Sequence, residues 1–328
     1  MLAVSLAAFS PALPRNSSLG NPRFDSVVTA AMNQCFQMEY AKAESLLARI
    51  PDDNPMRPYF TGLICLNRFQ DLGDTASLRR GEQLWEELSP RDPSSKCFKE
   101  DSLQLHAYQG LAEMQLSYLA ALRGSRMRSA SLALSAHGKL RSVSGVAEAD
   151  AGLALFEYYR ERVLQKIDFL PFVNPDPDAA LHRLETAAKA SLHLHDILRV
   201  SVFWIRLDRG EMDSALKISD EFLGRYPRNR LARQMRGSAL FHAGRFSEAR
   251  NIYEQVSGEY AVVRDSLPFN IPLGYFKAVG NLARIYAQLG MQAEAAARLS
   301  EWKKALDSGI SPWLPASLKR DLKRLENH

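Results

Sequence analysis

Two segments of the chain share one pattern of small and apolar residues at the same spacing. In each, a glycine is followed two positions later by a large apolar residue and three positions after that by an alanine. The matching residues are Gly210, Met212 and Ala215, and then Gly244, Phe246 and Ala249, so the copies lie 34 residues apart. A fixed period of this length is typical of an array of two-helix units, in which each unit contacts mainly its neighbours.

The spacing of apolar residues is helical almost throughout the chain, and no stretch alternates convincingly with period two. Gly and Pro separate the helical segments, at Gly73, Pro90, Gly124, Gly145, Pro171, Gly210, Pro227, Gly244 and Gly290. We therefore predict an all-α chain of about fifteen helices, most of roughly 12–20 residues, joined by short turns.

The repeated small residues have a physical purpose. Two antiparallel helices approach most closely where the crossing side chains are no larger than those of Gly or Ala. A glycine in the turn accepts the positive φ that other residues resist. Neither helix of a pair buries its apolar face alone, so pairs stack on one another. The residues that define this pattern are Gly210, Ala215, Pro227, Gly237, Gly244, Ala249, Gly290 and Ala295.

The segments 196–229 and 230–263 resemble consecutive tetratricopeptide repeats. The second has the family's small residues at Gly237 and Ala249, and its other marked positions are Leu240, Gly244, Phe246 and Tyr253. The first has Phe203 and Arg206 where a small residue and an aromatic residue are usual, so we expect an altered helix contact there. The resemblance implies a right-handed α-solenoid that binds other proteins.

Two further segments match the repeat more weakly. One is 276–309, and the other is 24–57, where Met38 stands in place of the turn glycine. The stretch 58–195 keeps paired helices without the 34-residue period. Irregular pairs followed by regular repeats resemble bacterial relatives of the tetratricopeptide family that includes the inclusion-body-clearance protein of the outer mitochondrial membrane.

These patterns divide the chain into four parts. Residues 1–23 form a signal-like or disordered segment, and 24–195 form an irregular half of helix pairs. Residues 196–314 hold the regular repeats, with a loop inserted at 264–275, and 315–328 form a capping helix. The apolar start lacks the basic residues that precede a signal peptide's apolar run, so a clipped signal and a loose tail both remain open. Export to the periplasm or envelope is favoured slightly over a cytoplasmic location.

Composition excludes several classes of protein. The 46% of hydrophobic residues is too high for a disordered chain, and no apolar run reaches the roughly 20 residues of a membrane helix. The net charge of +5 is interleaved with acidic residues, so we predict no nucleic-acid partner. Cys35, Cys65 and Cys97 lack metal-ligand spacing and are expected to be buried, although a Cys35–Cys65 disulfide is conceivable after export.

Catalytic and metal motifs are either missing or better explained by structure. The SxxK match at 300–303 includes Trp302, which is a core position of a repeat helix. His193 and His195 are two residues apart, so on one helix they point to different faces. In "NPDPDAA", Asp176 or Asp178 is expected to cap a helix rather than bind calcium. We predict no catalytic function, no metal and no cofactor.

The first helix of each pair lines the concave side of such an array. The resemblance places these residues in that groove: Trp204, Leu207, Gln234, Phe241, His242, Lys277 and Arg284. A peptide or helix with apolar anchors and an acidic end would fit, with Trp204 and Phe241 as the strongest contacts. Trp204 could instead pack in the core. The five arginines between 225 and 236 form either a solvated edge or a docking strip for an acidic segment.

Two other classes of function compete with the scaffold. An enzyme or small-ligand receptor would place its pocket between the middle helices and the apolar loops 168–175 and 265–275. A membrane-surface adaptor would require an exposed face of apolar and basic residues.

Overall fold

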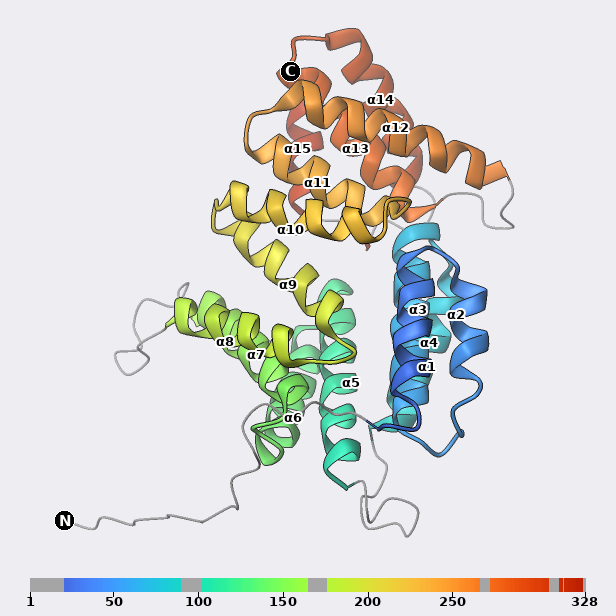
Figure 1. Cartoon of the computed structure of the whole chain (residues 1–328). Helices are drawn as coiled ribbons and strands as arrows, with labels where there is room; N and C mark the ends of the chain where they lie inside the picture. The colour runs from blue at the N-terminus through green and yellow to red at the C-terminus, as the bar shows by residue number, and fades with distance from the viewer. Residues whose placement is uncertain are drawn as a thin grey trace, which may run out of the picture.

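The computed structural model describes residues 21–89, 102–164, 176–265, 272–306, 313–314 and 316–326. The elements assigned in these ranges are fifteen α-helices (Figure 1). The first eight are α1 (Asp25–Phe36), α2 (Tyr40–Leu47), α3 (Met56–Leu72), α4 (Thr75–Leu88), α5 (Ser102–Leu122), α6 (Arg126–Ser142), α7 (Ala147–Leu164) and α8 (Pro177–Ala190). The others are α9 (His195–Asp208), α10 (Met212–Arg225), α11 (Arg230–His242), α12 (Phe246–Asp265), α13 (Leu273–Gln288), α14 (Gln292–Leu306) and α15 (Ala316–Leu325). The predicted all-α solenoid of about fifteen helices is confirmed.

The repeat turns adopt one backbone conformation. Gly210, Gly244 and Gly290 have φ angles of 79°, 74° and 73°. Met38, which stands at the turn-glycine position of 24–57, has a φ of 68° and adopts the same conformation. At each of these turns, the residue that follows the positive-φ residue donates its backbone amide to the carbonyl five positions before it, at 2.9 Å. The Glu39 amide, for example, donates to the Gln34 carbonyl. The bond satisfies a carbonyl that the end of the helix leaves free.

Glycines also mark where paired helices touch. A Cβ on Gly237 would lie 2.7 Å from the Tyr253 ring, and one on Gly280 would lie 2.9 Å from the Trp302 side chain. The same arrangement occurs in α3 and α4, where a Cβ on Gly62 would lie 2.4 Å from the indole ring of Trp85. Separations below about 3 Å are not tolerated between real atoms, so each aromatic ring fits only because its partner is glycine.

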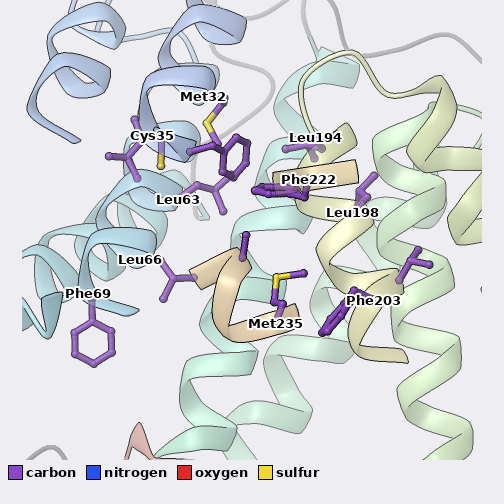
Figure 2. Close-up of a cluster of buried hydrophobic side chains, with 14 of the residues drawn as sticks. Met32, Cys35, Leu63, Leu66, Phe69, Leu194, Leu198, Phe203, Phe222 and Met235 are labelled. Atoms are coloured by element: carbon purple, nitrogen blue, oxygen red, sulfur yellow. The ribbon is translucent and has the colours of Figure 1, made fainter. Parts of the chain in front are cut away.

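The first helices of the array pack against its regular repeats. In Figure 1, α1–α4 stand below α12 and α13, and Figure 2 shows side chains from both parts in one cluster. Phe36 of α1 packs against Phe222 and Tyr226 at centroid distances of 5.3 and 5.2 Å. Side chains from both sides of residue 195 therefore share one core.

The C-terminal end completes this closure. Leu318 and Leu322 of α15 are buried, and α15 lies along α13. Trp313 packs on Phe69 of α3 at 5.0 Å, while the Arg123 guanidinium lies 4.9 Å from its ring. Trp313, close to the end of the described residues, thus contacts the first half of the chain.

Candidate functional site

Trp204 is the most exposed large aromatic residue on the described helices of the regular repeats, α9 to α14. It lies on α9, is 44% exposed, and packs its ring on Phe203 at a centroid distance of 5.0 Å. Phe203 is fully buried, although the repeat pattern calls for a small residue there. The large Phe203 ring fills the interior position, and the adjacent Trp204 faces outward.

Phe241 and His242 lie at the end of α11, in the next repeat. The Arg284 guanidinium of α13 lies 4.4 Å from the Phe241 ring centroid, within the range of a cation–π interaction. Arg284 also pairs with Asp321 of α15 at 2.8 Å. Partial burial and the positive charge of Arg284 lower the pKa of His242, which favours its neutral form. We give the name open inner surface to the predicted inner positions that keep solvent exposure, namely Trp204, the partly buried Phe241 and His242.

Other predicted groove residues are covered by the chain itself. Leu207 and Gln234 are buried, at 9% and 8% exposure. Gln234 lies 3.3 Å from the Tyr260 hydroxyl, to which its amide nitrogen donates. Tyr260 in turn donates to Asp71 at 2.6 Å. The structure thus brings Gln234 into contact with a network centred on α3.

Asp71 is the centre of that network and is completely buried. Its carboxylate accepts from both Nε, at 3.0 Å, and Nη2 of Arg230. It also accepts from the hydroxyls of Tyr40, at 3.1 Å, and Tyr260. A buried charge needs pairing and hydrogen bonds to offset its lost hydration, and Asp71 has both.

Lys277 of α13 belongs to the same region. Burial lowers its pKa from 10.5 to about 8, while the negative charge of Asp71 acts in the opposite direction. Gly274, one turn earlier, admits the Tyr260 hydroxyl, because a Cβ there would lie 2.1 Å from it. The first turn of α13 therefore packs closely against residues of α3 and α12.

Arginines of the cluster between 225 and 236 mostly pair with the chain's own carboxylates. Their partners are Asp196 for Arg225, Asp71 for Arg230, Glu259 for Arg233 and Asp220 for Arg236. These four arginines connect neighbouring helices, so the cluster is neither a simple solvated edge nor a free docking strip. A depression of about 460 Å³ beside it is lined mainly by charged residues, of which Asp220 and Arg236 pair with each other.

The histidines that might have suggested a metal have structural partners. His193 lies 2.9 Å from Asp25 and 3.4 Å from Thr29, both on α1, and so fastens the α8–α9 connection to the first helix. His195 Nδ1 contacts the Ala188 carbonyl oxygen at 2.7 Å. Within the described ranges no group of three metal-ligating side chains occurs. Asp176 caps α8 by accepting from the Ala179 amide, as predicted.

Cys35 and Cys65 are buried free thiols, so the conceivable disulfide between them is not formed. Burial raises the pKa of Cys65 to about 11, which keeps it protonated. Cys97 and the loops 168–175 and 266–271 lie outside the described residues. Among the helices that are described, none combines the length and hydropathy needed to cross a membrane.

No protein-family model and no curated protein matches this sequence. Solved structures of repeat proteins are similar at low levels. A Podosopora anserina kinesin light chain structure with nearly identical TPR-like repeats has 14% identity and a TM-score of 0.28, over 77% of this chain and 96% of that chain. The human IFIT1 dimer with PPP-AAAA has 12% identity and a TM-score of 0.34, over 88% and 72%. Identities and TM-scores this low assign no function to this chain.

Proposed function

We propose that this protein is a non-catalytic scaffold that binds another protein through the open inner surface. The observation that carries the proposal is the exposure of Trp204. An indole ring that is 44% exposed, on the first helix of a repeat, is available to a partner. Large aromatic side chains supply much of the binding free energy at protein interfaces.

The chemistry of the surface favours one kind of partner. Trp204 and the edge of Phe241 offer apolar contact, and Arg284 and His242 lie beside Phe241. A peptide or helix with a large apolar anchor fits this surface. An acidic end on that partner would bind Arg284 by competing with Asp321, because His242 favours its neutral form. Gln234 is buried and bonded to the Asp71 network, so it supports the surface rather than contacts a partner directly.

The experiment is a cross-linked pull-down from the native organism. Wild-type protein is compared with a Trp204→Ala/Phe241→Ala variant after both show equal helical signal and equal melting temperature. Val262→Ala is the matched control, because Val262 is 75% exposed on α12, outside the proposed surface. A set of proteins captured by the wild type and by the control, and lost in the double variant, supports the proposal.

Two results would oppose it. Capture of the same proteins by all three forms would place binding elsewhere. Capture of nothing above background would favour the competing hypothesis, an enzyme or small-ligand receptor with a pocket near loops 168–175 and 265–275. Most of those two loops lies outside the described residues, so the alternative stands on the sequence alone.

A further inference from the structure

Helix α6 carries apolar side chains on the face that points away from the rest of the protein. Met127 is 86% exposed and Leu134 is 66% exposed, the first and third highest values among the large apolar residues whose exposure is described. The opposite face is buried on α5 and α7 through Ala136 and Leu140. An amphipathic helix with one packing face normally keeps its apolar residues on that face alone. The outward pair on α6 therefore needs an explanation of its own.

The outward residues form a continuous stripe. Met127, Ser131, Leu134 and Gly138 follow one another at spacings of four, three and four, which places them on one side of a helix. A Cβ on Gly138 would meet nothing within 4 Å, so this side is open. We call these four residues the α6 face. Met127 and Leu134 stand about 10 Å apart along the axis, with small residues between and beyond them. The two large side chains form ridges and the two small residues leave grooves, so another helix can pack its side chains between them.

The charge on α6 has one sign. Its seventeen residues include Arg126, Arg128, Lys139 and Arg141 and contain no Asp or Glu. Arg128 and Lys139 reach back to Glu86 and Glu113 on neighbouring helices. Arg126 and Arg141 are exposed near the two ends of the α6 face, about 22 Å apart along the axis. The chemical complement of such a face is an apolar stripe with an acidic residue near each end.

We propose that the α6 face is a second docking surface, and that its partner is an amphipathic helix with acidic residues at both ends of its apolar stripe. A second copy of this chain is a poor occupant, because pairing two α6 helices in either direction brings Arg126 or Arg141 near an arginine of the other copy. An anionic membrane surface would also attract the arginines. Helices that lie in a membrane surface usually carry bulky apolar residues, whereas Ser131 and Gly138 favour close approach of another helix.

The test uses the full chain and a designed peptide. The probe is a fluorescein-labelled peptide of about 18 residues, or five helical turns, with leucines on one face and glutamates near both ends. A peptide of the same composition, with the leucines scattered around the helix, is the comparison. Binding is measured by fluorescence anisotropy. Leu134→Glu and Met127→Glu disrupt the face at exposed positions, and Val262→Glu makes the same change at an exposed site on α12.

We expect saturable binding of the amphipathic peptide to the wild type and to Val262→Glu, and at least about tenfold weaker binding to Leu134→Glu. Arg126→Glu/Arg141→Glu should also weaken binding, more than Arg49→Glu/Arg79→Glu at exposed positions in the turn after α2 and on α4. Trp204→Ala/Phe241→Ala should bind normally, which separates this proposal from the one above.

Three results would overturn the proposal. The first is an absence of saturable binding to the wild type. The second is equal binding to wild type and Leu134→Glu, or equal binding of the two peptides. The third uses vesicles of phosphatidylcholine with and without phosphatidylserine. If the wild type associates only with the vesicles that contain phosphatidylserine, and Leu134→Glu does not associate with them, the α6 face is a membrane-binding surface instead.

Discussion

Removal of the Asp71 carboxylate should destabilise the whole protein. Asp71 is fully buried and is the charged partner of Arg230, whose side chain is only 15% exposed. In Asp71→Ala the guanidinium stays buried without a counter-charge, and breaking one side of such a pair costs about 3–5 kcal/mol. The Tyr40 hydroxyl can still donate to the Met38 sulfur. The Tyr260 hydroxyl still accepts from Gln234, but its O–H loses its acceptor, which places the cost toward the upper part of this range. The expected loss is roughly 4 kcal/mol, a large part of a typical domain's stability.

The assay is urea unfolding at neutral pH, followed by helical circular dichroism and by tryptophan fluorescence. Trp85 reports on the first half of the chain and Trp302 on the regular repeats, and both are buried. A double variant, Asp71→Leu/Arg230→Met, removes both charges and should recover at least about half of the loss. A cost below about 1 kcal/mol for Asp71→Ala, or no recovery in the double variant, would refute this reasoning about the pair.

Two further predictions concern packing and pH. Gly237→Ala should lower the free energy of unfolding by about 1–3 kcal/mol, because the added Cβ would lie 2.7 Å from Tyr253. Gly258→Ala adds a Cβ with nothing within 4 Å and should stabilise α12 by up to about 1 kcal/mol. Urea midpoints measure both changes, and equal effects would contradict the packing account. Burial lowers the pKa of Lys277 to about 8 from 10.5, so between these pH values only the unfolded chain holds the proton and stability rises with pH. In Lys277→Met this rise should be absent, so the change in unfolding free energy between pH 8 and 10.5 should differ between the two proteins by at most about 3 kcal/mol. Parallel curves of stability against pH for wild type and Lys277→Met would contradict this prediction.

The local features of the fold could be predicted from the sequence because their causes are local. Gly210 and Gly244 lie 34 residues apart, Gly290 follows the inserted loop, and all three have the positive φ that the turn requires. Gly237 meets Tyr253 within one repeat, so both partners of the close contact lie within one period. Asp176 caps the helix that begins next to it. In each case a short segment contains the whole physical argument.

The closure of the array could not be predicted in this way. Asp71 and Arg230 are 159 positions apart, and no periodic pattern connects them. The repeat pattern placed Gln234 and Lys277 on the inner side, but it carried no information about what covers that side. Arg230 looked like part of a surface cluster because its partner comes from another half of the chain. Trp204 was predicted on the inner side with its exposure left open, and its exposure follows from Phe203 taking the interior position.

The most direct test of the scaffold proposal is photo-cross-linking at single positions in the native organism. A photoreactive amino acid is placed at residue 204 or 242 on the open inner surface, or at residue 262 on α12 as a control. Our account predicts discrete, reproducible adducts of higher mass from positions 204 and 242 and none from position 262. Equal adducts from all three positions, or adducts from position 262 alone, would contradict binding at the open inner surface.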